Sequence, residues 1–288
     1  MIAHVAEAGE QRGRVVLQLG CTAPSRIVLE AAIRIAQAFQ SEIESLFIEA
    51  PQIYDVACFP HVREISLCGR ARRDLSPEIV ARQMRQMAHD TGRRVTELAR
   101  LAEVPTHMTI VRDEPLHAMA KACRDCGPWN VIVLGDQLMP TCGTALRQLF
   151  EGVADTTGIV VVGPHARTTQ GPILAAIEDI GHLEPMLRAA RRLLPPDSEQ
   201  RPILVLIGDD TDALEALEGQ VRLVLGADES VGIVKAEAAH GAPAGPADTL
   251  RRFNGGFVIG QLGSRLIPAD GDLRHLAAAL ACPLFVVR

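Results

Sequence analysis

The segment Asn130-Val-Ile-Val-Leu-Gly135 is followed, after a helical stretch, by Ile159-Val-Val-Val-Gly163. The same order returns near the end of the sequence, where Gly256-Phe-Val-Ile-Gly260 precedes Leu284-Phe-Val-Val-Arg288. Unbroken runs of Val, Ile and Leu bounded by glycine are typical of central parallel strands that are buried on both faces. Each segment therefore predicts a strand, a glycine turn, a helix and a second strand, and the sequence contains an internal repeat.

The pattern extends toward the start of each half. We expect a strand, a helix and a second strand at residues 14–19, 24–40 and 44–49 in the first half, and at 172–177, 183–194 and 202–208 in the second. The middles differ, because the first half has an irregular stretch at 51–75 before a long helix that starts at Ser76-Pro77. The second half has instead a helix at 211–225, a strand at 231–236 and a short helix from Ala247.

Strands alternate with helices throughout, which predicts an α/β protein with a mostly parallel five-strand sheet in each half. The polar segment 165–171 separates the halves, so we expect one domain at residues 1–164 and a shorter, divergent one at 171–288. A length of 288 residues suits two domains.

Composition excludes several classes of function. Aromatic residues make up 3% of the chain and its net charge is −6, which argues against a nucleic-acid-binding protein. No apolar run approaches the roughly 20 residues that span a bilayer, so we expect no membrane segment. The seven scattered cysteines suit a reducing compartment, and we expect a cytoplasmic protein.

This order of strands and helices resembles the universal stress protein domain, over residues 14–163 and again over 171–288. The resemblance is strongest in the last two strands of each half, and Asp113-Glu114-Pro115 resembles the turn after the family's third strand. It implies two tandem, doubly wound domains of the Rossmann-like, adenine nucleotide alpha hydrolase-like type. It also implies an internal pseudo-dimer that joins the halves through residues 159–162 and 284–287, with a further homodimer left open.

Members of that family that bind ATP carry an acidic residue after the first strand and a G-x2-G-x9-G-[ST] stretch after the fourth. The first half departs from both, because Gly20 stands at the acidic position and Leu138 at that of the second glycine. Eight residues lie between Gly143 and Gly152 instead of nine, and Val153 replaces the hydroxyl residue. The resemblance therefore implies no ATP binding of the family type in the first half.

The second half is closer to the motif. Its candidate nucleotide-binding residues are Glu178, Gly260, Gly263 and Ser264. Glycines let backbone N–H groups approach phosphate, and a helix start favours negative charge. However, Gly271 follows after seven residues instead of nine, and the carboxylate of Asp272 would repel phosphate. A simple strand-to-helix turn is the alternative explanation of these glycines.

Three further groups of residues are candidate sites. Cys123-Arg-Asp-Cys126 is a C-x-x-C pair, but it lies at the C-terminal end of a helix, where the dipole disfavours a thiolate. Cys58, His61 and Cys68 match no metal-ligand spacing, and we expect no metal site. The arginines of the long helix predict a solvated face, with binding of a polyanion as the alternative. We also expect no catalytic residues, because no known catalytic motif is present.

The sequence thus favours a non-enzymatic stress-response or regulatory protein that acts through an unknown protein partner or a small ligand, with no cofactor. The first alternative is a nucleotide-binding switch or weak ATPase that uses ATP in the second half. The second alternative is a thiol redox sensor built on Cys123 and Cys126.

Overall fold

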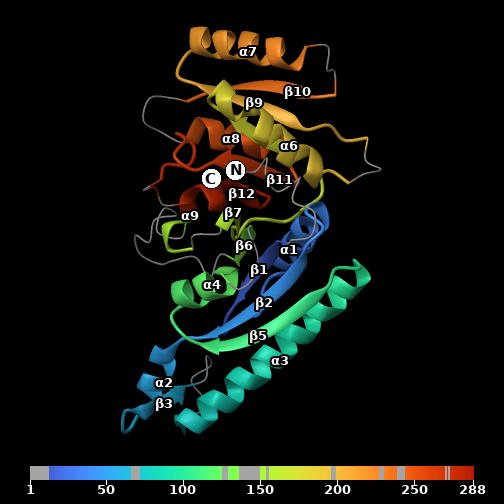
Figure 1. Ribbon diagram of the computed structural model, residues 1–288. Helices are drawn as coiled ribbons and strands as arrows, with labels where there is room; N and C mark the ends of the chain where they lie inside the picture. The colour runs from blue at the N-terminus through green and yellow to red at the C-terminus, as the bar shows by residue number, and fades with distance from the viewer. Residues whose placement is uncertain are drawn as a thin grey trace.

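The computed structural model describes residues 13–65, 72–124, 129–135, 150–153, 156–195, 199–226, 230–238, 244–269, 271 and 273–288. Within these residues the chain is an α/β protein built on one ten-stranded sheet (Figure 1). The strands of this sheet are β1 (Arg14–Leu19), β2 (Glu42–Glu49), β5 (Thr106–Arg112), β6 (Asn130–Gly135), β7 (Thr156–Val162), β8 (Ile173–Ile177), β9 (Ile203–Gly208), β10 (Gly232–Glu237), β11 (Phe257–Gln261) and β12 (Leu284–Val287).

The helices alternate with these strands, as the repeat predicted. They are α1 (Arg26–Ala38), α2 (Pro51–Cys58), α3 (Pro77–Leu101), α4 (Pro115–Arg124), α6 (Leu183–Leu193), α7 (Thr211–Leu225), α8 (Ala244–Arg252) and α9 (Leu273–Ala279), with a short 3₁₀ helix η3 (Ile180–His182) before α6.

Both halves use the same strand order. The sheet runs β10-β9-β8-β11-β12-β7-β6-β1-β2-β5, so the first strand of each half lies between its second and fourth strands. Within each half, all neighbouring strands of this ten-stranded sheet are parallel. The halves meet where β7 and β12 pair antiparallel, with Gly158 opposite Val287 and Val161 opposite Leu284. The prediction of a doubly wound α/β fold in two tandem repeats is confirmed.

The sheet separates two hydrophobic cores. Helices α1, α3, α6 and α7 cover one face, and α4, α8 and α9 cover the other. Successive residues of a central strand alternate between the cores: Val15 and Leu17 of β1 face the first, and Val16 faces the second. Strands that are buried on both faces explain the continuous apolar runs in the sequence.

One buried arginine connects the helices of the two halves. Arg34 of α1 is 9% exposed, and its Nε and Nη2 atoms donate hydrogen bonds of 3.1 and 3.0 Å to the carbonyl oxygen of Leu193, the last residue of α6. A cation at a helix C-terminus is stabilised by the helix dipole. The guanidinium also lies 5.6 Å from the ring centroid of Phe257, so α1 and α6 are held together across the seam.

The expectation of an irregular stretch at 51–75 was wrong in part. Residues Pro51–Cys58 form α2, which has proline in its first turn, and β3 (Arg63–Ile65) pairs antiparallel with β4 (Arg72–Asp74). The long helix α3 begins where the Ser76-Pro77 signature placed it, and the Ser76 hydroxyl accepts a hydrogen bond of 3.4 Å from the Ile79 N–H. Among the described residues, no helix combines the length and apolar character needed to cross a membrane.

Candidate functional site

The acidic residue that follows the first strand of the second half contacts the turn after β11. Glu178 lies directly after β8, and its Oε2 accepts a hydrogen bond of 2.8 Å from the Arg265 N–H. Its Oε1 accepts one of 3.0 Å from the Leu266 N–H. These amides lie in the turn after the fourth strand, where the sequence predicted a phosphate-binding loop. The protein's own carboxylate therefore occupies two of the backbone donors that a bound anion would use.

The glycines of this turn have separate structural roles. A Cβ on Gly260 would lie 2.4 Å from Cδ1 of Ile267, so a larger residue there would require the end of the Ile267 side chain to move. Gly263 has φ +87°, which favours glycine, and its N–H donates to the Ile267 carbonyl at 2.9 Å. The Ser264 hydroxyl accepts a hydrogen bond of 3.1 Å from the Ile267 N–H. The structure thus brings all four candidate residues to one turn, which is closed by its own contacts.

The turn is also fixed by a charge pair. The Arg265 guanidinium forms an ion pair with Asp209, the residue after β9. The hydrogen bond to Asp209 is the main reason that the pKa of Arg265 is raised. Since Glu178 and Asp209 both face this region, the carboxyl end of the second-half sheet carries negative charge that opposes binding of phosphate.

The corresponding edge of the first half has a different composition. Gly20 follows β1, and the Cys21 thiol lies 3.5 Å from the sulfur of Met84 on α3. Burial is the largest cause of the raised pKa of Cys21, and the nearby Glu49 raises it further. Gly135 ends β6, but Leu138 and Gly143 lie outside the described residues, while Val153 is buried in the core.

Sequence reasoning missed a cluster at this edge. Glu49, the last residue of β2, accepts a hydrogen bond of 2.7 Å from the Tyr54 hydroxyl and bonds of 3.3 and 3.4 Å from the Arg112 guanidinium. That guanidinium lies 3.6 Å from the Tyr54 ring centroid. Burial and then the bond to Glu49 raise the pKa of Tyr54. Pro51 was the available signal, because proline is preferred at the first position of a helix. It indicates that Tyr54 lies on α2, which turns back toward β2.

The first cysteine of the C-x-x-C motif is buried in the hydrophobic core. Cys123 is fully buried near the end of α4, 4.0 Å from the Thr156 hydroxyl, and Cys126 lies outside the described residues. A buried thiol is poorly placed to react. Cys58 is exposed at the end of α2, His61 is exposed at φ 69°, and Cys68 lies outside the described residues. No cluster of three or more His, Cys, Asp and Glu side chains that could hold a metal was found in the described part of the chain.

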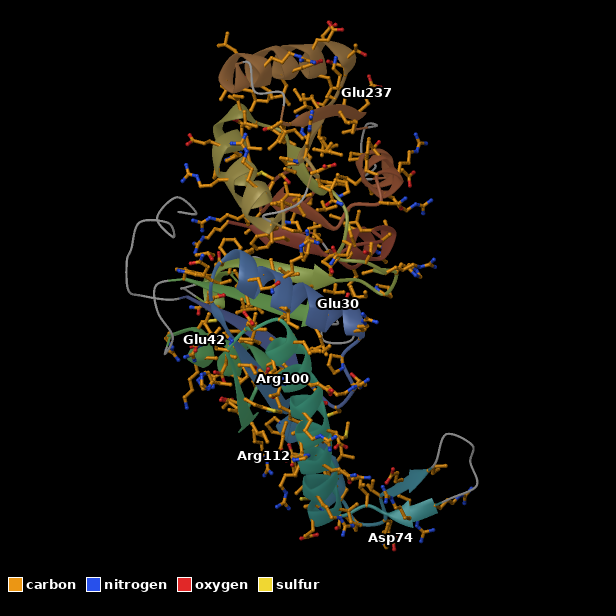
Figure 2. All side chains as sticks on the ribbon, turned by 90° about the vertical axis from the view of Figure 1, so that its right-hand side faces the viewer. Glu30, Glu42, Asp74, Arg100, Arg112 and Glu237 are labelled. Carbon is orange, nitrogen blue, oxygen red and sulfur yellow. The ribbon has the colours of Figure 1, made fainter. Side chains whose placement is uncertain are left out.

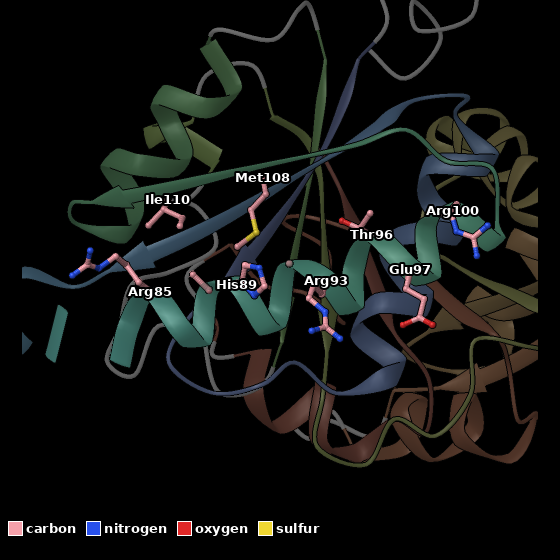
Figure 3. Close-up of a pocket in the computed structure, with 10 residues that line it drawn as sticks. Arg85, His89, Arg93, Thr96, Glu97, Arg100, Met108 and Ile110 are labelled. Carbon is pink, nitrogen blue, oxygen red and sulfur yellow. The ribbon is translucent and has the colours of Figure 1, made fainter. Parts of the chain in front are cut away.

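The arginines of the long helix line a groove. The groove has a volume of about 680 Å³ and lies between α3 and the edge strand β5 (Figure 3). In a view turned by 90°, Arg100 lies at the end of α3 nearest the other half and Arg112 lies at the end of β5 (Figure 2). Arg100 lines the groove, whereas Arg112 lies outside its lining and is paired with Glu49.

No model of a known protein family matches the sequence, and no curated protein matches it. Solved structures do match the fold. A universal stress protein from Archaeoglobus fulgidus has a TM-score of 0.55 at 14% identity, covering 95% of this chain and 96% of that one. A putative universal stress protein from Pseudomonas aeruginosa has a TM-score of 0.53 at 15% identity, covering 99% and 94%.

A third similar structure is part of a transport protein. The cytoplasmic domain of a prokaryotic cation chloride cotransporter has a TM-score of 0.54 at 12% identity, covering 96% of this chain and 95% of that one. At these identities the likeness concerns the fold, and it extends over both halves of each chain. The described part of the chain therefore has the fold of the universal stress proteins.

Proposed function

We propose that this protein is a non-enzymatic regulatory protein of the stress response, which acts in the cytoplasm through a protein partner or a small ligand and binds ATP in neither half. The observation that carries the proposal is the pair of hydrogen bonds from the Arg265 and Leu266 amides to Glu178. A nucleotide phosphate in the second half would have to displace this carboxylate and leave it without its partners, which costs free energy.

The first half supports the same proposal. Gly20 supplies no carboxylate at the position where a ribose or adenine group would be held. The nearby carboxylate of Glu49 is bonded to Tyr54 and Arg112 instead. This fold does not imply that a protein is an enzyme. In the cation chloride cotransporter, it forms a cytoplasmic domain of a transport protein.

The test is to denature freshly purified protein, identify any released small molecule by mass spectrometry, and titrate ATP with Mg²⁺ by calorimetry on the same batch. We expect no released nucleotide and no heat of binding. Released ATP, ADP or AMP, or micromolar ATP binding, would contradict the proposal.

The second candidate is a nucleotide-binding switch or weak ATPase in the second half. It is favoured by one observation, namely that the Arg265 and Leu266 amides already hold an anionic group. This candidate requires ATP binding that is lost in Gly263→Val and retained in Gly219→Ala, a control on α7 where an added Cβ meets no atom within 4 Å.

A further inference from the structure

The groove beside the long helix has an apolar floor and a basic rim. We call it the α3–β5 groove; the residues that line it include Arg85, Arg93, Glu97 and Arg100 of α3 and Met108 and Ile110 of β5. Figure 3 shows Met108 and Ile110 between the strand and the helix, with the polar side chains along α3. Ile110 is 48% exposed, which is unusual for a β-branched apolar residue in a sheet.

One wall of the groove is an open strand edge. Strand β5 is the last in the sheet order and pairs only with β2 among the described strands. Ile43 is opposite Thr106 and its N–H donates to the Pro105 carbonyl. In a parallel pair of strands, residues direct their backbone N–H and C=O groups alternately toward the strand on one side and toward the strand on the other. The N–H and C=O groups of Met108 and Ile110 therefore point away from β2, on the side where a further strand could pair.

The charges around the groove are mostly positive. Arg93 and Arg100 are exposed and make no ion pair within the described residues, and the Arg85 Nε donates to the Ala81 carbonyl. Glu97 is the one carboxylate in the lining. On the other face of β5, Glu42 pairs with His107 and Glu44 accepts a hydrogen bond from Thr109, whereas Glu49 is already paired with Arg112 at the end of the strand.

These positive charges determine which kind of partner the groove attracts. A second copy of this chain that paired through its own β5 would bring arginine-lined grooves together, and like charges disfavour that contact. An acidic extended segment would instead be attracted. Arg85, Arg93 and Arg100 are separated by about 12 and about 10 Å along the helix at 1.5 Å per residue. Side chains four residues apart on one face of a strand are separated by about 13 Å, a similar spacing.

We propose that the α3–β5 groove binds an extended acidic segment of a partner protein, which adds as a strand to β5 and sets its carboxylates against the arginines of α3. This inference rests on the proposed function, because it names the kind of partner through which the protein acts. Main-chain hydrogen bonds to the strand edge would supply affinity, and the apolar floor and basic rim would supply specificity.

The test uses a fluorescent peptide of about eight residues that alternates glutamate with valine, long enough for one strand. We expect saturable binding by fluorescence anisotropy that weakens as salt is raised. Ile110→Pro removes only a backbone N–H that points away from β2, so binding should fall about tenfold further than in Ile110→Ala, which keeps that N–H. Arg93→Glu should weaken binding several-fold, whereas Arg94→Glu, next to it but outside the groove lining, should not.

Several outcomes would overturn the inference. These are no peptide binding, equal binding of a lysine–valine peptide, equal effects of Ile110→Pro and Ile110→Ala, or equal effects of Arg93→Glu and Arg94→Glu. Dimerisation that Ile110→Pro abolishes would assign the edge to a second copy instead. The exposed Arg93 site keeps the test informative if Ile110→Pro does not fold. If the peptide does not bind, the result of the ATP titration still stands. ATP binding would contradict the proposed function whether or not the peptide binds.

Discussion

The Glu178 carboxylate accepts the backbone hydrogen bonds that a bound anion usually accepts at a turn of this kind. Backbone N–H groups at a turn before a helix need an acceptor, and a charged acceptor forms hydrogen bonds roughly twice as strong as neutral ones. In this protein the acceptor is covalently part of the chain, so the turn is closed without a bound anion. The carboxylate also links β8 to the turn after β11, through contacts 87 and 88 residues apart in sequence.

Replacing Glu178 with alanine should therefore destabilise the protein. The change leaves two amides without their acceptor, and we expect the free energy of unfolding to fall by about 1–2 kcal/mol. Urea unfolding followed by circular dichroism measures it. Glu184→Ala is the control, because Glu184 makes only an exposed ion pair with Arg188, and its loss should cost less than about 0.5 kcal/mol. Equal costs for the two variants would show that the Glu178 contacts do not stabilise the turn.

The described cysteines should differ sharply in reactivity. Burial raises the pKa of Cys282 from its ordinary value of 9.0 to about 12, whereas Cys58 is exposed. At pH 8, iodoacetamide should modify Cys58 within minutes and Cys282 only after urea is added, as peptide mapping by mass spectrometry would show. Because the unfolded thiol ionises near 9 and the native one near 12, this group favours the native state below pH 9. Its contribution is lost as the pH rises toward 12. Rapid labelling of Cys282 in native protein would contradict this.

The candidate site could be predicted only in part. Glu178, Gly260, Gly263 and Ser264 were identified by their order around two strands, and the structure brings them to one turn. The partners of Glu178 could not be predicted, because every residue except proline has a backbone N–H. The sequence therefore does not show which amides donate to this carboxylate. The cluster of Glu49, Tyr54 and Arg112 was missed for another reason, since it depends on a helix that sequence reasoning did not expect.

At the scale of elements, helix starts are set by side chains that accept hydrogen bonds from the first turn. The Asp210 carboxylate accepts one of 2.8 Å from the Ala213 N–H at the start of α7. Such a cap satisfies an otherwise unpaired amide and places negative charge at the positive end of the helix dipole.

Asp210→Ala should lower the free energy of unfolding by about 1 kcal/mol, whereas Asp210→Asn should retain most of the stability. Thermal unfolding by calorimetry would measure both. If the alanine and asparagine variants melt at the same temperature, the hydrogen bond to Ala213 does not contribute to stability.

The elements that sequence predicted well are those whose pattern is long or strongly apolar. The central strands and α3 fall in this class, because burial on two faces leaves an unbroken apolar run and a helix buried on one side leaves a repeated apolar stripe. Helix α2 and the β3–β4 pair were not predicted. Both are short, and β3 and β4 are held by pairs such as Arg63–Asp74 and Arg73–Glu64 that have no hydrophobic period.

At the scale of the molecule, two five-stranded sheets become one because the backbones approach closely at the seam. The glycine at position 158 of β7 makes room for the Phe285 ring, since a Cβ there would lie 2.4 Å from its Cε2 atom. Gly163, just after β7, lies against the backbone of α9, a helix of the other half. Small residues at these points let the antiparallel β7–β12 pair and its flanking helix pack together.

Gly163→Ala is the sharpest test of that seam. The added Cβ would lie 2.1 Å from the carbonyl oxygen of Ala277, a backbone atom that cannot rotate away. We expect the free energy of unfolding to fall by about 3 kcal/mol, because the seam must open to admit the methyl group. Gly219→Ala, inside α7 with open space around its Cβ position, should instead gain up to about 1 kcal/mol from helix propensity. Urea unfolding of both variants measures the difference. Native-like stability of Gly163→Ala would mean that α9 can shift without cost, and that the two halves are held together without close packing of α9 against Gly163.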